Sequence, residues 1–361
     1  MDNITVLITG AGAPGAPGII KSLRMVTERD IRIIGVDMAS ESSGFAMVDK
    51  WYIGEKAESK NFIPRILEIC RKEDVDVVIP LVTNELMKFA RSVSEFERIG
   101  TKVVISSPER LRIANNKYLL MQICKENDIP TPRFCKVQSW SDFEEAVYEQ
   151  GYPELPVCFK PPVSRGLRGF RILKGDVDRL DLLMNYKPTD VFTTLEDVSK
   201  VLKDATPFPE LLVMEYLPGK EYSVDVLTNK GEALIVIPRL REKLKMGISF
   251  VGTTVNNEAI IEYSKQVVKL LGLDGNIGLQ FKLDGKGIPK IIESNPRVQG
   301  TIVLCTAAGV NMVYDVVKLA LNEEIEECQE DVKWGIKMIR YWDEVYVKNG
   351  EYFTLQELEE V

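Results

Sequence analysis

Short apolar runs alternate with amphipathic stretches over residues 1–112. Four runs bounded by turn residues predict buried parallel strands: ITVLITG, IRIIGVD, VDVVIPL and KVVIS. Two helices are predicted between them, NFIPRILEICRKE and NELMKFARSVSEFERIG. The second carries one apolar face, formed by Leu86, Phe89, Val93 and Phe96. Strands that alternate with helices favour a doubly wound α/β domain with a parallel sheet.

A different pattern follows over residues 113–330. A predicted helix, NNKYLLMQICKEND, leads to the short strand PVCFKP, and further helices are expected near 176–186 and 194–203. Three strands then come in succession, LLVMEYL, EYSVDVLT and ALIVIPR, before a helix and the hairpin NIGLQFKLDGKGIPKIIESNPR. Strands that follow strands indicate an antiparallel sheet, so this unit is predicted to be α+β. Residues 331–361 are predicted to form a C-terminal extension with a strand and a short acidic helix.

Composition narrows the classes of function. The net charge of −8 and the lack of any Lys/Arg-rich run argue against a nucleic-acid partner. The longest apolar runs are strand-sized, so no membrane partner is expected, and the N-terminal MDNITVLITG is unlike a signal peptide. Six scattered cysteines without a Cys-x-x-Cys pair are typical of a reducing cytosol and predict a cytoplasmic protein.

The chain contains no histidine. Ser-His-Asp and Cys-His catalysis, histidine-based zinc sites and histidine general bases are therefore excluded in this chain. Chemistry must come from carboxylates, amides, lysine, arginine and bound metal.

A glycine-rich loop follows the first predicted strand, in LITGAGAPGAPGIIKSLR. The second strand ends on Asp37, about where an acid would meet a ribose hydroxyl in a dinucleotide-binding fold. An NAD-dependent oxidoreductase is one hypothesis, and it depends on residues 10–37 alone.

The predicted hairpin near the C-terminus carries a second candidate site. Alternation along its first strand places Gln280 on the polar face, while Glu293 and Asn295 are two residues apart and share a face. If Leu283 pairs with Lys290 around the loop, Gln280 lies opposite Glu293. The alternative is a hairpin with an ordinary solvated face.

An amide, a carboxylate and a second amide form a donor set that suits magnesium, with phosphate oxygens completing its octahedron. Arg297, just beyond the strand, would supply a cation for a transferring phosphate. Lys117 begins a predicted helix, and Lys160 ends a strand before a loop with glycines. Each lysine taken alone is equally consistent with a solvated surface charge.

The order of these elements resembles the ATP-grasp superfamily. The resemblance rests on Lys117, on Lys160 with its loop, on MEYLPGKEYSVD, on PRLREKLKMGIS and on IIESNPRVQGT with the upstream Gln280. It covers roughly residues 1–325 and is similar above all to the synthetase domains of the carbamoyl-phosphate synthase large subunit and to related stand-alone carboxylate–amine ligases.

The resemblance implies a Rossmann-like pre-ATP-grasp domain over 1–112 and a two-lobed ATP-grasp fold over 113–330. The lid lobe would span about 113–205 and the C-terminal lobe about 206–330. In that superfamily the N-terminal glycine loop generally does not bind NAD. The resemblance therefore implies that the loop indicates the fold rather than a cofactor, and that it helps to bind the acceptor substrate.

The resemblance also implies roles for individual residues. Nucleotide contacts are expected from Lys117, Lys160, Ser164, Gly166, Glu215, Tyr216, Leu217, Glu221, Gln280 and Glu293. Within this set the two lysines would contact the phosphates, Glu215 and the backbone at Leu217 would read the adenine edge, and Glu221 would hold the ribose. The loop of residues 163–169 would close over the phosphates, although Arg165 and Arg168 stand where related loops have glycine.

Magnesium, with Mn²⁺ as an alternative, would be held by Gln280, Glu293 and Asn295. The catalytic residues implied are Arg297, which would steady an acyl phosphate, Lys160, and Arg239, which would anchor a substrate carboxylate. The substrate side is expected to include Gly12, Gly15, Glu85, Met246 and Gly247.

The implied activity is that of an ATP-dependent ligase. ATP would phosphorylate a small carboxylate to an acyl phosphate, and an amine would then displace the phosphate. Activation of bicarbonate to carboxyphosphate is the alternative within the same fold, and a binding protein with a degraded site is a further one. No second synthetase copy is present, so carbamoyl phosphate is not the expected product of this chain alone. A homodimer is left open.

Overall fold

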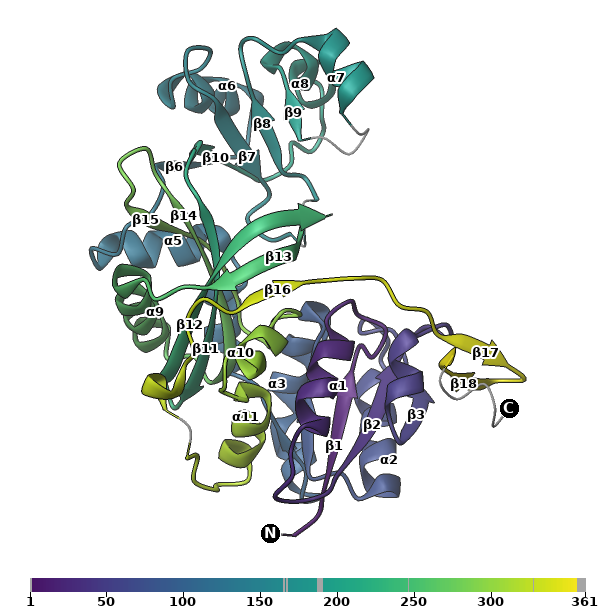
Figure 1. Ribbon diagram of the computed structural model, residues 1–361. Helices are drawn as coiled ribbons and strands as arrows, with labels where there is room; N and C mark the ends of the chain where they lie inside the picture. The colour runs from purple at the N-terminus through teal and green to yellow at the C-terminus, as the bar shows by residue number, and fades with distance from the viewer. Residues whose placement is uncertain are drawn as a thin grey trace.

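The computed structural model describes residues 2–164, 166, 168–186, 191–245, 247–326 and 328–355. Figure 1 shows an N-terminal α/β domain, a central antiparallel sheet beside it, and a smaller lobe at the far end of that sheet. The C-terminal segment runs from the central sheet back to the N-terminal domain. None of the helices within the described ranges is both long and apolar enough to cross a lipid bilayer.

The N-terminal domain is built on a parallel sheet with the strand order β3-β2-β1-β4-β5. Its strands are β1 (Ile4–Thr9), β2 (Ile31–Asp37), β3 (Lys50–Ile53), β4 (Val77–Ile79) and β5 (Lys102–Val103). Its helices are α1 (Ala16–Arg24), η1 (Ser43–Met47), α2 (Phe62–Glu73), α3 (Thr83–Glu97) and α4 (Pro108–Ala114). The predicted parallel α/β domain is confirmed, although β3 was not predicted, because this half-exposed edge strand has an apolar run of only three residues, 51–53.

The direction of winding reverses between β1 and β4, and ligands of such sheets collect at the carboxyl ends of the strands at this point. The glycine loop of residues 10–15 follows β1 and therefore lies at that edge.

The small lobe contains a sheet with the order β6-β10-β7-β8-β9. Its strands are β6 (Phe134–Val137), β7 (Val157–Lys160), β8 (Arg171–Leu173), β9 (Phe192–Thr193) and β10 (Leu211–Glu215), and its helices are α6 (Trp140–Glu149), α7 (Arg179–Asn185) and α8 (Leu195–Leu202). The expected lobe limit at 205 is corrected by β10, which pairs with β6 and β7. At the other limit, α5 (Lys117–Glu126) packs its buried residues Leu120 and Cys124 into the core of the central sheet.

The central sheet has the order β15-β14-β11-β12-β13-β16 and is antiparallel. Its strands are β11 (Glu221–Asn229), β12 (Glu232–Lys245), β13 (Ile248–Thr254), β14 (Gly275–Leu283), β15 (Pro289–Asn295) and β16 (Lys337–Ile339), and its helices are α9 (Glu258–Leu271), α10 (Val303–Ala307) and α11 (Met312–Ala320). One apolar core joins this sheet to the N-terminal domain, because Ile8 and Ile20 share a cluster with Ile237 and Val313. The two units therefore pack as one body.

Residues 336–355, here called the C-terminal strap, connect the central sheet to the N-terminal domain (Figure 1). After η2 (Gln329–Asp331), β16 adds to the edge of the central sheet, so the extension is part of that lobe rather than separate from residue 331. The strap then forms the hairpin β17 (Tyr346–Lys348) and β18 (Glu351–Phe353). Tyr352 packs edge-on against Phe45 and Trp51, and its hydroxyl donates to the Ser40 carbonyl. The predicted acidic helix falls largely on residues 356–361, outside the described residues.

Candidate active site

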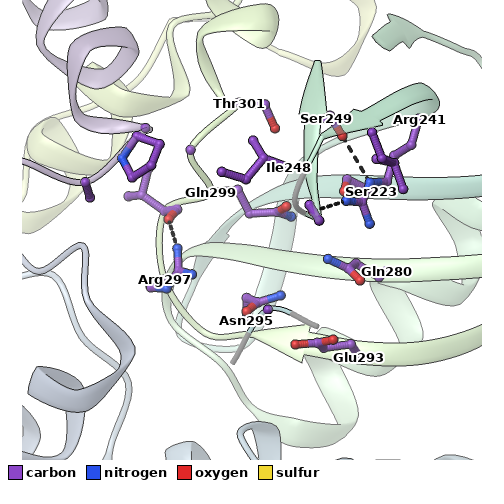
Figure 2. Close-up of a pocket in the computed structure, with 18 of the residues that line it drawn as sticks. Ser223, Arg241, Ile248, Ser249, Gln280, Glu293, Asn295, Arg297, Gln299 and Thr301 are labelled. Carbon is purple, nitrogen blue, oxygen red and sulfur yellow. Dashed lines mark hydrogen bonds between the residues drawn. The ribbon is translucent and has the colours of Figure 1, made fainter. Parts of the chain in front are cut away.

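A cavity of about 370 Å³ lies where the three parts of the chain meet. Its walls come from the glycine loop, the end of β7, the hairpin β14–β15, the strands β12 and β13, and residues 297–301. Figure 2 shows Gln280, Glu293 and Asn295 on neighbouring strands, with Arg297 to the left of them. A volume of this size is typical of small-molecule sites.

The hairpin that carries the candidate metal ligands contains a β-bulge. Leu283 pairs with Pro289, so the expected pairing of Leu283 with Lys290 is wrong by one residue. A register shift after Phe281 then returns Gln280 to its expected position opposite Glu293. A bulge re-aims the backbone next to it, and here the Ile292 carbonyl accepts a hydrogen bond from Lys160 Nζ at 3.1 Å.

The donor set fits a magnesium ion that arrives with a nucleotide. Gln280, Glu293 and Asn295 all line the cavity and offer one carboxylate and two amides. Within the described ranges, no group of three or more Asp, Glu, Cys or His side chains could hold a metal by itself. Magnesium commonly uses one or two protein carboxylates and takes its other oxygens from water and phosphate. The role of these three residues as metal ligands stays a prediction.

Two buried lysines face these groups. Lys117 opens α5, where the Asn116 side chain caps the helix by accepting from the backbone N–H groups of Tyr118 and Leu119. Lys117 Nζ lies 3.6 Å from Glu293 Oε1 and 3.3 Å from the Ser164 carbonyl oxygen. Burial lowers the pKa of Lys160, and the Glu293 carboxylate opposes that shift. Two ammonium groups beside one carboxylate favour an anionic ligand.

The loop after β7 reaches the cavity through Ser164 and Gly166. Residues 165 and 167 lie outside the described residues, so the expectation for Arg165 stands without a structural account. Met246, expected on the substrate side, also lies outside them, whereas its neighbour Gly247 lines the cavity.

Arg297 joins the cavity to the N-terminal domain. Its Nε donates to Thr83 Oγ1 at 3.1 Å, and its Nη1 donates to the Val298 carbonyl at 2.8 Å. Thr83 begins α3, so this bond crosses between the central sheet and the parallel sheet. Neither partner is charged, which leaves the positive charge of Arg297 available to an anion in the cavity.

Arg239 does not reach the cavity, which corrects its expected role. Only 2% of its surface is exposed, and Nη2 lies 2.6 Å from Asp225 Oδ2. Its Nη1 also donates to the backbone and hydroxyl oxygens of Thr301, which does line the cavity. Arg239 therefore supports the wall from behind and cannot anchor a substrate carboxylate from this position.

Arg241 is a cationic cavity residue that was not predicted from the sequence. It lines the cavity and forms an ion pair with Glu221, and it also donates to Ser249 Oγ at 3.0 Å and to the Gly247 carbonyl at 2.5 Å. Its spacing from Arg239 could have identified it, because residues 239 and 241 are two apart on one strand and share a face. Glu221, expected to hold a ribose, lines the cavity with its carboxylate paired to Arg241.

The residues expected to read adenine lie outside this cavity. The Glu215 carboxylate at the end of β10 pairs with Arg133 at 3.2 Å and with Lys290 at 2.5 Å. Burial by itself would raise the pKa of Glu215, but the hydrogen bonds from Lys290 and Arg133 outweigh it, so the pKa is lowered. Tyr216 and Leu217 follow Glu215 and do not line the cavity either. Their contact with adenine stays a prediction.

Two of the expected substrate residues differ in their surroundings. Gly12 donates its N–H to Asp37 Oδ2 at 2.8 Å, and Asp37 Oδ1 accepts from Ala39 N at 2.9 Å. Asp37, the acid of the NAD hypothesis, is therefore bound to the backbone around it. Gly15, in contrast, lines the cavity.

Glu85 lies in the first turn of α3 and accepts a hydrogen bond from the hydroxyl of Thr9, the last residue of β1. It does not line the cavity, which corrects its expected place on the substrate side. Burial raises the pKa of Glu85 to about 7; the Thr9 hydrogen bond opposes the rise, and the Asp37 carboxylate adds to it.

Glu85→Gln is expected to stabilise the protein at about pH 8 and to change little near pH 4.5. The stability that the neutral carboxyl provides is lost as the pH rises from the ordinary value of 4.5 to the folded value of about 7. The difference corresponds to about 3 kcal/mol. Thermal midpoints of both proteins across this range measure it, and parallel curves would show that Glu85 titrates normally.

Arg340 is a second cavity residue that was not predicted from the sequence. It follows β16 in the C-terminal strap and lines the cavity, where its guanidinium donates to the carbonyls of Pro14 and Gly300. No local pattern in the sequence connects the strap to the cavity, because the pairing of β16 with the distant strand β13 helps to bring it there.

Comparisons with known proteins give two family matches. Residues 207–340 match the model described as ATP-grasp in the biosynthetic pathway with Ter operon, and residues 6–104 match the PylC-like N-terminal domain. The carbamoyl phosphate synthase large chain of Clostridium acetobutylicum is 24% identical over 307 residues, which cover 82% of this chain and 26% of that protein. The same protein from Methanothermobacter thermautotrophicus is 22% identical over 316 residues, with coverages of 83% and 28%. The chain thus spans about a quarter of the length of these relatives.

Solved structures show the same fold. The ADP complex of PurK, N5-carboxyaminoimidazole ribonucleotide synthetase, superimposes with a TM-score of 0.68 at 17% identity and covers 93% of this chain and 81% of its own. The biotin carboxylase domain of Hydrogenobacter thermophilus 2-oxoglutarate carboxylase, solved with MgADP, ADP and bicarbonate, gives 0.65 at 20% identity, with coverages of 92% and 73%. At these identities the likeness concerns the fold alone.

Proposed function

Because the chain belongs to the ATP-grasp superfamily, we propose that it is an ATP-dependent carboxylate–amine ligase. It phosphorylates a small carboxylate with Mg-ATP and joins the resulting acyl phosphate to an amine, releasing ADP and phosphate. The observation that carries the proposal is the cavity in which Lys117, Lys160 and Arg297 face the oxygen donors of Gln280, Glu293 and Asn295.

Phosphoryl transfer depends mainly on positioning and charge neutralisation, so it suits a chain without histidine. Magnesium, when bound, neutralises phosphate charge and would be held by Gln280, Glu293 and Asn295. Lys117 and Lys160 bind the phosphate oxygens from the other side. Arg297 binds the carboxylate oxygens beside the transferring phosphate and keeps the acyl phosphate in place.

The cavity also limits water. An acyl phosphate exposed to solvent would hydrolyse before an amine reached it. The buried lysines and the close approach of Gly15 to Gly300 enclose one side, and Ser164 and Gly166, which also line the cavity, are proposed to shield the other when the nucleotide binds.

A second candidate is the activation of bicarbonate to carboxyphosphate. It is favoured by the similarity to carbamoyl phosphate synthase large chains and by the structural neighbour from Hydrogenobacter thermophilus, which was solved with bicarbonate. Because the chain spans about a quarter of those relatives, their complete reaction is not proposed for it.

The protein is expected to bind Mg-ATP and not NAD. Calorimetric titrations with each ligand, with magnesium present, test this directly, because the cavity offers cations for phosphate whereas Asp37 is bound to backbone. Heat from NAD with none from Mg-ATP would overturn the proposal. A phosphate-release screen over carboxylates, amino acids and bicarbonate would then identify the acceptor.

A further inference from the structure

Arg340 enters the cavity from the C-terminal strap. Val251 on β13 pairs with Ile339 on β16, and the Arg340 backbone N–H donates to the Phe250 carbonyl at 2.9 Å. The backbone that carries this side chain is thus held by the central sheet. Its Nη1 donates to the Pro14 carbonyl at 3.3 Å, and its Nη2 donates to the Gly300 carbonyl.

The carbonyls of Pro14 and Gly300 lie where the backbones of the N-terminal domain and the central lobe come close together. A Cβ placed on Gly15 would lie 2.2 Å from the Cα of Gly300, so the two backbones touch. Arg340 bridges this seam on the glycine-loop side of the cavity. The position is fixed from two directions, since the strap is also attached to the N-terminal domain through Tyr352.

Among the described residues, Arg340 lacks a counter-charge. Arg241 pairs with Glu221 and Arg239 with Asp225, whereas no carboxylate in the described part of the chain pairs with Arg340. Burial lowers the pKa of Arg340, and the positive charge of nearby Arg239 adds to the effect. Backbone carbonyls use two of the five N–H groups without neutralising the charge. A half-buried cation in a cavity favours an anion that brings its own charge.

We propose that Arg340 binds a second anionic group of the acceptor substrate. The inference rests on the proposed function, in which the reacting carboxylate lies beside Arg297 and the metal ligands. The acceptor is then a carboxylate that carries another carboxylate or a phosphonate-like group, and bicarbonate, with a single charge, is not the preferred acceptor. Arg340 is a specificity residue, because it holds the part of the acceptor that does not react.

The test measures binding of simple anions to the full chain saturated with magnesium and a non-hydrolysable ATP analogue. Acetate and bicarbonate serve as singly charged probes, and succinate, glutarate and phosphonoacetate as doubly charged ones, with free magnesium held constant. At least one doubly charged probe is expected to bind about tenfold or more tightly than either singly charged probe. Arg340→Gln is expected to remove this preference and leave the affinity for the nucleotide analogue unchanged.

Lys337→Gln is the matched control. It removes one positive charge from the same strand, where Lys337 pairs with Glu242 outside the cavity, and the anion preference should persist. Equal or undetectable binding of all probes to the wild-type protein would overturn the inference, as would an unchanged preference in Arg340→Gln. Failure of the nucleotide analogue to bind would instead count against the ligase function itself.

Discussion

Glu293→Gln is expected to lower turnover by roughly a hundredfold or more while the protein stays folded. Glu293 is the carboxylate of the candidate metal trio, and its Oε1 lies 3.6 Å from Lys117 Nζ. The amide keeps the shape and a polar oxygen but removes the anionic charge on which a magnesium site depends. Phosphate release at saturating Mg-ATP measures the loss, and the thermal midpoint checks the fold.

Metal dependence separates this result from general damage. Lys117 and Lys160 remain in Glu293→Gln without their shared counter-charge, so ATP in the presence of EDTA should bind at least as tightly as to the wild-type protein. Glu262→Gln, an exposed change on α9, is the matched control and should turn over normally. Wild-type turnover in Glu293→Gln would place the metal site elsewhere.

Gly15→Ala is expected to reduce turnover by about a hundredfold, because it forces apart the two backbones that enclose the cavity. The added Cβ would meet the Cα of Gly300 at 2.2 Å, far inside the contact distance of about 3.5 Å between carbons. Gly15 has φ −93°, which alanine adopts freely, so the effect is steric. A displacement of about 1 Å at a reacting site costs roughly this factor.

Nucleotide affinity should change far less in Gly15→Ala than turnover does. The lysines and the hairpin lie on the other lobes and are not touched by the new methyl group. Gly285→Ala is the control, since a Cβ there meets only Pro218 Cγ at 4.0 Å. Turnover and calorimetry on both variants measure the two effects, and a Gly15→Ala protein with normal turnover would show that the seam is not needed for the reaction.

Gln280, Glu293 and Asn295 show how much a local sequence pattern can predict. Period-two alternation places Glu293 and Asn295 on one face whatever the rest of the chain does. The expected pairing of Gln280 with Glu293 assumed a hairpin register that is wrong by one residue at Leu283. A bulge at Ile292 removes this offset, so Gln280 still lies opposite Glu293. No local feature of the sequence predicts this bulge, because residue 292 is an isoleucine rather than a glycine or a proline.

Arg239, Arg241 and Arg340 show what a local sequence pattern cannot predict. Arg239 and Arg241 share a strand face and look equivalent in the sequence, yet one is buried against Asp225 and the other lines the cavity beside Glu221. The partner of a charged side chain depends on which distant strand lies next to its own. Arg340 is the extreme case, because its place follows from one strand pairing and one aromatic contact far along the chain.

The sequence by itself determined the parallel N-terminal sheet, the antiparallel unit after it, the absence of histidine chemistry and the residues that could hold a phosphate and a metal. These follow from backbone periodicity and side-chain chemistry, which act within a few residues. Only the tertiary structure decided that β10 belongs to the small lobe, that Glu85 is a buried carboxyl, and that Arg340 rather than Arg239 enters the cavity. Those outcomes depend on burial and on contacts between residues distant in the chain, which no local pattern encodes.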